Sequence, residues 1–242
     1  MAHSAPSLSI IVPAYNEEDR LGPTFELLRA WMDEKAREIQ VLVVDDGSTD
    51  GTAELVSSVA KSDARISLVS NGENRGKGYS VGNGVSKATG ELILFSDADL
   101  STPLGEFDRL ESAIEGHAIA IGSRALPDSR LEKRQPLYRE MMGRTFNLFV
   151  QAMVFPGIRD TQCGFKLFRR EAAQATFGRR KIDGFAFDVE ILFIARRLGY
   201  EVAEVPVLWI NDEASRVDPI RHSAQMFRDI MRIRRLHKDL KG

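Results

Sequence analysis

Cysteine is almost absent from this chain, which has only Cys163 among its 242 residues. A lone cysteine cannot form an internal disulfide bond, so the disulfide-rich secreted scaffolds are excluded and a reducing compartment is favoured. The residues around Cys163 do not suggest a nucleophile with a histidine base. We therefore expect a packed core thiol.

Long hydrophobic runs are also missing. The longest apolar run, Phe146–Ile158, is well short of the roughly 20 residues that a membrane-spanning helix needs, and it contains Asn147, Gln151 and Pro156. Residues 1–7 lack the basic start and apolar stretch of a signal peptide. We expect a cytoplasmic chain that does not cross a membrane.

Basic residues are scarce in the first half of the chain. Residues 1–120 carry 20 acidic and 10 basic side chains, whereas residues 121–242 carry 15 and 23, so the net charge of −2 conceals local charges of −10 and +8. The basic half should attract an anionic partner. Nucleic acid, phospholipid and a phosphorylated acceptor all fit this charge.

Short apolar runs alternate with helix-length amphipathic segments. Strands are expected at 8–12, 41–44, 66–69, 92–95, 119–121, 164–168 and 201–207, and helices at 19–37, 52–61, 78–88, 103–115, 186–198 and 219–238. This alternation predicts an α/β fold with a Rossmann-like, mostly parallel sheet and amphipathic helices toward the C-terminus. No repeat or linker divides the chain, so residues 1–242 are expected to form one domain.

Two carboxylates directly follow the expected strand at 92–95. Asp97 and Asp99 lie two residues apart, and in open α/β sheets ligands bind at the carboxyl ends of strands. Mg²⁺ and Mn²⁺ take carboxylate oxygens together with the oxygens of a substrate diphosphate. The pair predicts a metal that holds a nucleoside diphosphate, and an ordinary strand-ending turn is the alternative.

Three more strand-end loops support a nucleotide site. The first loop begins at Pro13, which is expected to end the strand. This loop either offers an aromatic ring and a carboxylate to a nucleoside or only begins a helix. The second loop turns sharply at Asp46, and the Asp46 side chain is expected to be directed at a base or ribose. The third, NRGKG at 74–78, brings backbone N–H groups and Lys77 toward phosphate. Its glycine spacing is neither a dinucleotide fingerprint nor a P-loop.

Together these motifs resemble the inverting glycosyltransferases of the A-type fold, in the large second family of the sequence classification. The match is carried by IVPAYNE at 11–17, VDDGSTDGT at 44–52 and SDAD at 96–99. The runs NRGKG at 74–78, GSR at 122–124, RDTQCGFKLF at 159–168 and AFDVE at 186–190 are similar to the dolichyl-phosphate β-glucosyltransferase branch. The resemblance covers residues 7–236.

The resemblance implies roles for individual residues. Contacts with the nucleotide sugar are implied for Pro13, Ala14, Tyr15, Glu17, Asp46, Lys77, Asp97 and Ala98, and contacts with an acceptor phosphate for Arg124, Arg139, Ser215 and Arg216. Residues 7–123 would form the donor half, and residues 124–242 the acceptor-binding, membrane-facing half. In the related dolichyl-phosphate mannose synthases a metal-binding glutamine lies two residues after the second aspartate, where this chain has Ser101.

The implied activity is metal-dependent, inverting transfer of a hexose, with glucose from UDP-glucose expected, to a polyprenyl or dolichyl phosphate. A phosphate monoester has a second pKa of about 6, so this acceptor is a dianion that needs no general base. A sugar hydroxyl acceptor would need one, and Asp188 and Asp160 are the candidates; Asp188 is otherwise an ordinary acid in a first helical turn. The alternatives are a GDP-mannose donor and a non-catalytic module that binds nucleotide sugars or nucleic acid.

The basic half also predicts a membrane surface as a partner. Segment 133–157 interleaves basic residues with bulky apolar ones, among them Phe146 and Phe149. An interfacial amphipathic helix has this pattern, and so does a core helix with a solvated basic edge. Residues 221–241 carry seven basic and two acidic side chains. We expect peripheral attachment at the cytoplasmic face of the cell membrane, with no nucleic-acid partner and the oligomeric state left open.

Overall fold

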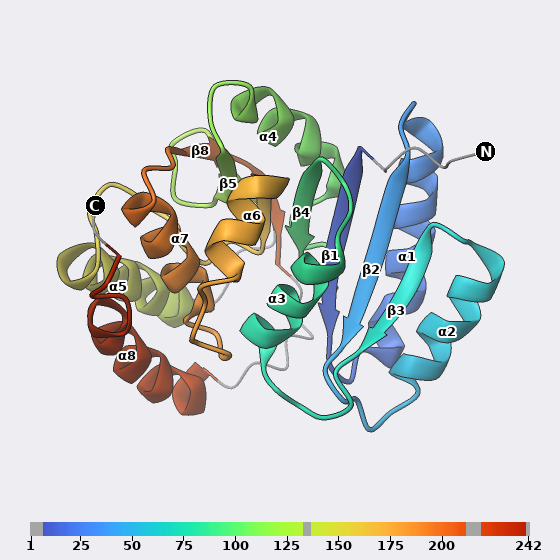
Figure 1. Ribbon diagram of the computed structural model, residues 1–242, viewed down its shortest axis with the longest axis horizontal. Coiled ribbons are helices and arrows are strands. Elements are labelled where there is room, and N and C mark those ends of the chain that lie inside the picture. The colour runs from blue at the N-terminus through green and yellow to red at the C-terminus, as the bar shows by residue number, and fades with distance from the viewer. Residues whose placement is uncertain (1–6, 133–136, 212–218, 241–242) are drawn as a thin grey trace.

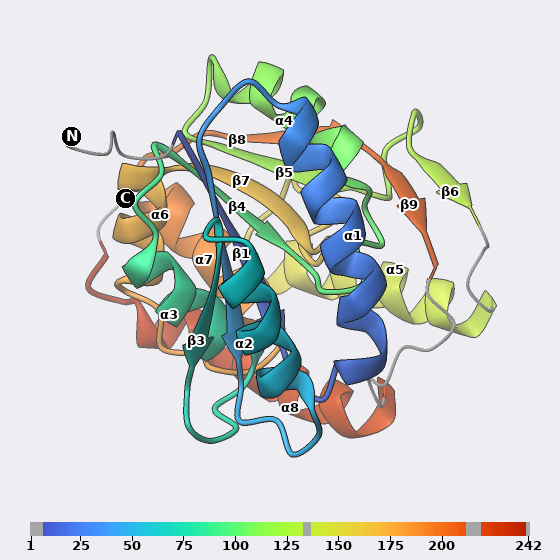
Figure 2. The ribbon, with the colours of Figure 1, turned by 90° about the vertical axis from the view of Figure 1, so that its right-hand side faces the viewer.

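The computed structural model describes residues 7–132, 137–211 and 219–240. A seven-stranded sheet forms its centre, with helices on both faces (Figures 1 and 2). The strands of this sheet are β1 (Leu8–Ala14), β2 (Ile39–Asp45), β3 (Ile66–Ser70), β4 (Leu92–Ser96), β5 (Ile119–Ser123), β7 (Phe165–Arg169) and β8 (Val202–Pro206). Two further strands, β6 (Arg130–Glu132) and β9 (Leu208–Ile210), form a separate parallel pair.

The helices match most of the expected amphipathic segments. They are α1 (Glu18–Glu34), α2 (Thr52–Ser62), α3 (Lys77–Lys87), the 3₁₀ turn η1 (Leu104–Glu106), α4 (Phe107–Ile114), α5 (Leu137–Met153), α6 (Arg170–Phe177), α7 (Phe187–Arg197) and α8 (Pro219–Leu236). Two features were not expected from the sequence: helix α6 and the β6–β9 pair. The β6 side chains are all exposed, so no apolar run marks that strand.

The strand order is β3-β2-β1-β4-β7-β5-β8. All neighbours are parallel except β7, which runs antiparallel to both β4 and β5. The predicted α/β fold with a mostly parallel sheet is confirmed. Because β7 comes from the second half of the chain and lies between two strands of the first half, both halves contribute to one sheet.

Side chains alternate between the two faces of the sheet, which gives two apolar cores. Ile10 and Val12 of β1 pack in the core that contains residues of α1, α2 and α4. Ile11, between them, packs with Phe95 in the core beneath α3, α6 and α7. This alternation is the period of two that a strand requires, and burial of both faces explains why the strands read as nearly continuous apolar runs.

The carboxyl ends of β1, β2 and β4 lie along one edge of the sheet. Ala14 pairs with Asp45, and β4 ends at Ser96 beside them in the strand order. Pro13 does not end β1, contrary to expectation, because it still pairs with β2 while pairing with β4 stops at Ile11. Proline is tolerated there because one flank of the strand is already unpaired.

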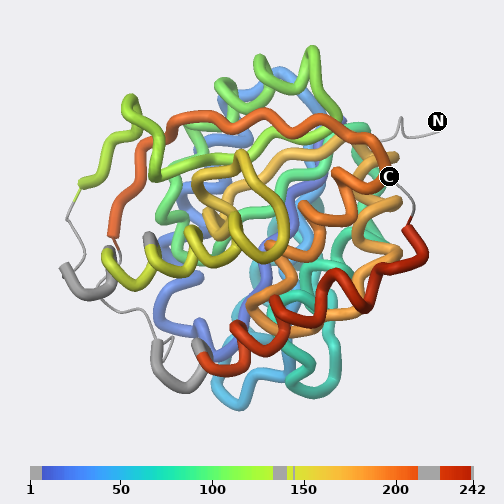
Figure 3. Tube along the Cα trace, turned by 90° about the vertical axis from the view of Figure 1, so that its left-hand side faces the viewer, coloured from blue at the N-terminus to red at the C-terminus, as the bar shows by residue number. Residues whose placement is uncertain are grey.

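Helices α5 and α8 lie side by side at one end of the molecule (Figures 1 and 3). The Phe227 ring of α8 makes edge contacts with the rings of Phe146 and Phe149 of α5, at 5.8 and 4.9 Å between centroids. Phe146 is buried, so at this position the core-helix alternative for segment 133–157 holds and the ring is not available to a membrane. No helix within the described ranges is both long and apolar enough to span a bilayer.

Candidate active site

The loops that follow β1 and β2 are tied to each other by hydrogen bonds. The backbone N–H of Asn16 donates to Ser48 Oγ at 2.9 Å, and that of Glu17 donates to Thr52 Oγ1 at 2.8 Å. Asn16 has a φ of 55°, a left-handed conformation that asparagine tolerates. Tyr15, which directly follows β1 and precedes these bonded residues, is 44% exposed.

Asp46 points into the protein. Its Oδ1 accepts hydrogen bonds from Asn71 Nδ2 at 2.7 Å and from the Arg75 N–H at 2.9 Å, and its Oδ2 accepts one from the Gly76 N–H at 2.8 Å. The carboxylate is buried. Asp46 thus fixes the loop before α3, and its implied contact with the nucleoside stays a prediction.

Backbone N–H groups of the glycine-rich segment are largely occupied. Those of Arg75 and Gly76 bond to Asp46, and those of Gly78 and Tyr79 donate to the Asp183 carbonyl at 2.7 and 3.2 Å. The expectation that these groups bind phosphate is wrong, because protein acceptors already satisfy them. The Lys77 side chain is what this segment offers to an anion.

Lys77 meets the aspartate pair after β4. Its Nζ lies 2.7 Å from Asp97 Oδ1, and Asp99 Oδ1 accepts a hydrogen bond from the Ser101 N–H at 2.9 Å. Burial, and then the neighbouring Asp97 charge, raise the pKa of Asp99. Ala98 between them is fixed through its carbonyl, which accepts from Thr24 Oγ1 at 2.7 Å. A cation beside both carboxylates would relieve their repulsion.

A second ion pair is buried close by. Lys166 Nζ lies 2.5 Å from Asp188 Oδ1 and 2.6 Å from the Cys163 carbonyl oxygen, and the Lys166 side chain has no exposed surface. Burial raises the pKa of Asp188, and the charges of Lys166 and Lys77 oppose that rise. Asp188 is therefore held by an ammonium and is not a free base in this structure.

The third ion pair joins Arg124 to Asp160. Arg124 Nε and Nη2 donate to the two carboxylate oxygens at 2.7 and 2.9 Å, and the Arg124 N–H adds a bond at 3.0 Å. Burial alone would raise the pKa of Asp160, but the Arg124 charge outweighs it and lowers this pKa to about 2. The Arg124 guanidinium also lies 5.6 Å from the centroid of the Trp209 ring. The sequence suggested separate roles for Arg124 and Asp160, and the structure pairs them.

The Phe95 ring and one backbone hydrogen bond connect these ion pairs into one cluster. The Phe95 ring lies 5.4 Å from Lys77 Nζ and 5.7 Å from Lys166 Nζ. The Asp97 N–H donates to the Gly164 carbonyl at 3.1 Å, which joins the Asp97 loop to the segment that carries Asp160. The result is a set of alternating charges at the carboxyl end of β4, suited to a phosphorylated ligand and a metal.

Residues 9–177 match the family described as glycosyl transferase family 2. The chain belongs to this family. It is 40% identical over 240 residues to a dolichyl-phosphate β-glucosyltransferase of Dictyostelium discoideum, covering 94% of this chain and 73% of that protein. It is 34% identical over 241 residues to the Homo sapiens protein of the same description, covering 94% and 74%.

Solved structures share the fold of this glycosyltransferase at low sequence identity. Glucosyl-3-phosphoglycerate synthase from Mycobacterium tuberculosis, crystallised with UDP, has a TM-score of 0.68 and 19% identity, covering 97% of this chain and 80% of that one. The same enzyme with Mn²⁺, UDP and glucosyl-3-phosphoglycerate has a TM-score of 0.67 and 18% identity, covering 94% and 78%.

The aspartate pair of the glycosyltransferase fits a divalent metal that is shared with substrate. Among the described residues, no group of three or more His, Cys, Asp or Glu side chains could hold an ion by itself. Mg²⁺ typically takes one or two carboxylates and completes its shell with substrate phosphates and water. Asp97 and Asp99 supply that number of carboxylates, which agrees with a metal bound together with a nucleoside diphosphate.

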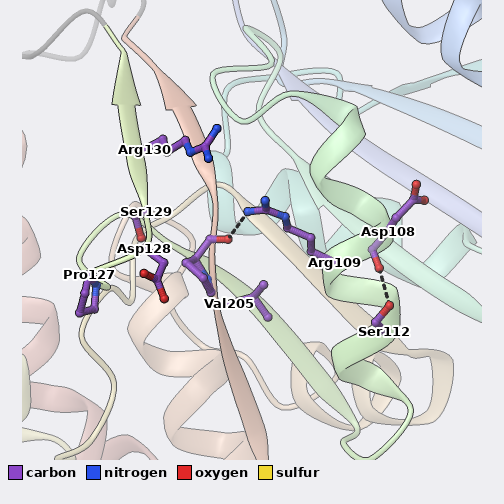
Figure 4. A pocket seen from close by; sticks show the side chains of 9 residues that line it. Asp108, Arg109, Ser112, Pro127, Asp128, Ser129, Arg130 and Val205 are labelled. Atoms are coloured by element: carbon purple, nitrogen blue, oxygen red, sulfur yellow. Dashed lines mark hydrogen bonds between the residues drawn. The ribbon is translucent and has the colours of Figure 1, made fainter.

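Some residues implied in acceptor binding cannot be placed. Ser215, Arg216 and the Arg139 side chain lie outside the described part of the structure. A groove of about 830 Å³ lies elsewhere in the glycosyltransferase, between α4, the β5–β6 connection and β8 (Figure 4). Its lining includes Arg109, which donates to the Pro206 carbonyl at 3.3 Å, and none of the predicted site residues.

Lys166 is the site residue that sequence reasoning missed. Its signal was a lone charge within FKLF at 165–168, since a lysine between buried apolar neighbours in a strand needs a buried partner. Gly164 was noted only as part of a motif. Its role is steric: a Cβ there would lie 1.9 Å from Asp97 Oδ2, so this position must be glycine for the carboxylate to keep its place.

The Arg124–Asp160 pair predicts an acid-dependent contribution to stability. Because the folded pKa of Asp160, about 2, is below the unfolded value of 3.8, the contribution is full above about pH 4 and is lost as the pH falls toward 2. It amounts to about 2 kcal/mol. We expect Asp160→Asn to lower the free energy of unfolding at pH 7 and to weaken its dependence on pH between 4 and 2, measured by urea unfolding. An unchanged pH dependence in the variant would contradict this assignment.

Proposed function

We propose that this glycosyltransferase transfers glucose from UDP-glucose to dolichyl phosphate or another polyprenyl phosphate, with inversion at the anomeric carbon. The observation that carries the proposal is the similarity, over 94% of the chain, to dolichyl-phosphate β-glucosyltransferases at 34–40% identity. The charge cluster at the carboxyl end of β4 supports it. A diphosphate leaving group and a phosphate acceptor both require positive charge at the reacting centre. Lys77 pairs with Asp97, and Arg124 pairs with Asp160 in the segment that is bonded to the Asp97 loop.

In the proposed reaction Asp97 and Asp99 would hold the metal, which would supply positive charge to the departing nucleoside diphosphate. Lys77 adds a positive charge to the same phosphates, and Tyr15 contacts the nucleoside from the exposed rim. Arg124 orients the acceptor phosphate for in-line attack, with Asp160 fixing the plane of its guanidinium. Residues 7–123 are then the donor half and 124–242 the acceptor half.

A phosphate acceptor suits this site better than a sugar hydroxyl. A hydroxyl needs a general base with a pKa near neutrality. Asp160 has a pKa of about 2 and bonds to Arg124. Burial raises the pKa of Asp188, but its carboxylate is held by the buried Lys166 ammonium. Because both candidate bases are neutralised by cations, a nucleophile that is already ionised, such as a phosphate monoester, fits the geometry.

A panel of donors and acceptors tests the proposal. The purified protein is incubated with Mn²⁺ and labelled UDP-glucose, UDP-galactose or GDP-mannose, together with either a short polyprenyl phosphate or the corresponding alcohol. We expect labelled lipid only from UDP-glucose and the phosphate. Transfer from GDP-mannose would overturn the donor assignment, and equal transfer to the alcohol would overturn the acceptor assignment.

We further propose that α5 and α8 attach the enzyme to a lipid surface, peripherally at the cytoplasmic face of the membrane that carries the acceptor. Large apolar side chains are exposed on both helices, with Met141 67%, Leu148 68% and Met231 56% exposed. Exposed basic residues lie beside Met231 on α8, among them Arg228 and Arg232. This combination suits insertion at an anionic interface.

Flotation with vesicles checks this attachment. We expect the protein to float with anionic vesicles at low salt, and binding to fall sharply at 1 M salt, where the Debye length is about 3 Å. Serine at both Leu148 and Met231 should reduce flotation further. The matched control is Leu27→Ser on α1, another apolar side chain that is 59% exposed. No flotation at low salt, or an equal loss in the control, would contradict the proposal.

A further inference from the structure

The two oxygens of Asp97 have different surroundings. Oδ1 lies 2.7 Å from Lys77 Nζ and has less than 1 Å² of exposed surface. Oδ2 faces the backbone of Gly164, where a Cβ would lie only 1.9 Å away. A divalent cation that binds Asp97 must therefore displace the ammonium from Oδ1 or turn the carboxylate, which breaks the same ion pair.

The backbone around Lys77 is held firmly. The Gly76 N–H bonds to Asp46, and the Gly78 N–H donates to the Asp183 carbonyl at 2.7 Å. A Cβ on Gly76 would lie 2.6 Å from that same carbonyl oxygen, and one on Gly78 would lie 2.6 Å from Phe187 Cβ. The start of α3 is thus packed directly against the segment 183–187, and a shift of the Lys77 ammonium has to come from its side chain.

The Lys77 side chain has the freedom that this shift needs. It is 24% exposed, whereas Lys166, the other ammonium over the Phe95 ring, has no exposed surface and also bonds to the Cys163 carbonyl. A lysine side chain has a flexible stem of four carbons joined by rotatable bonds, and its compact charge can change partner without a movement of the backbone. Lys77 is the exchangeable cation of the cluster, and Lys166 is the fixed one.

We propose that Lys77 is an internal counter-cation that a divalent metal displaces from Asp97 and that then pairs with the donor diphosphate. The inference rests on the proposed function and adds a coupling to it. Without a diphosphate, metal binding breaks the Lys77–Asp97 ion pair and leaves the ammonium and the metal competing for the Asp97 and Asp99 carboxylates. With a diphosphate, the displaced ammonium gains phosphate oxygens in place of Asp97. Metal and nucleotide should therefore each strengthen binding of the other.

Binding of Mn²⁺, measured by the electron paramagnetic resonance signal of the free ion, tests the exchange without any turnover. Titrations are made with and without UDP on the unaltered protein and on Lys77→Met. We expect the variant to bind Mn²⁺ alone at least about fivefold more tightly, because a competing positive charge is gone. UDP should strengthen Mn²⁺ binding in the unaltered protein and do so much less in the variant. Thermal melting confirms that both are folded.

Arg75→Met is the matched control, since it removes a positive charge two residues away that pairs with Glu73 and not with Asp97. Its affinity for Mn²⁺ should change less than about twofold. An equal gain in both variants, or no gain in Lys77→Met while Mn²⁺ still binds, would overturn the exchange alone. Absence of Mn²⁺ binding in every protein, even with UDP, would overturn the metal-dependent function and the exchange with it.

Discussion

Asp99→Asn is expected to reduce glucosyl transfer by at least about a thousandfold, because it removes one of the two charged ligands of the metal that stabilises the leaving diphosphate. The stability of the folded protein should not decrease. Burial, and then the Asp97 charge, raise the pKa of Asp99, so we expect its negative charge to cost stability in the folded protein. The neutral variant should melt at the same temperature as the unaltered protein or slightly higher, as expected where function and stability oppose each other.

Initial rates at saturating Mn²⁺ and both substrates, together with thermal melting, check this expectation. Asp128→Asn serves as the matched control, because Asp128 is an exposed aspartate in the groove near α4 and lies outside the charge cluster. Its rate should be unchanged. A rate for Asp99→Asn within tenfold of the unaltered protein would remove Asp99 from the metal site.

Gly164→Ala is expected to lower the rate by about a hundredfold, since a displacement of about 1 Å at a reacting group has effects of that size. The added Cβ would lie 1.9 Å from Asp97 Oδ2, so the carboxylate must leave its position. Gly164 has no positive φ, so the backbone itself accepts alanine. The loss should therefore come from Asp97 and not from unfolding.

Gly116→Ala is the control for this substitution, because a Cβ at Gly116 meets no atom within 4 Å. It should leave both rate and melting temperature close to those of the unaltered protein. The affinity for Mn²⁺ in the presence of UDP gives an independent readout, and it should weaken in Gly164→Ala. Normal turnover in Gly164→Ala would show that the position of Asp97 is not critical.

The strands were predictable from sequence because both faces of the sheet are buried. A strand such as β2 needs apolar side chains on each face, and VLVV at 41–44 supplies them. The direction of β7 was not predictable, since nothing in the pattern of residues 165–169 distinguishes an antiparallel strand from a parallel one. The exposed strand β6 has no apolar run at all and depends on pairing with β9.

Part of the active site was predictable for a different reason. Asp97 directly follows strand β4, and Lys77 begins helix α3. The carboxyl end of this strand and the amino end of this helix lie at the same edge of the sheet, so the contact between the two side chains follows from topology. The partners of Arg124 and Lys166 depend on segments 36 and 22 residues away, and no local pattern specifies them. The sequence predicted that Asp46 faces a ligand, and it did not reveal that the Arg75 and Gly76 N–H groups donate to this carboxylate.

The structure of the product tests most directly whether this enzyme makes a β-linked glucosyl phosphate lipid. The protein, Mn²⁺, UDP-glucose and a short polyprenyl phosphate are incubated, and the glycolipid is isolated and examined by proton magnetic resonance. We expect a glucosyl phosphate ester whose anomeric proton shows the large coupling of a β linkage, the inverse of the α linkage in UDP-glucose. An α-linked product, or a product with no phosphate between sugar and lipid, would contradict this expectation.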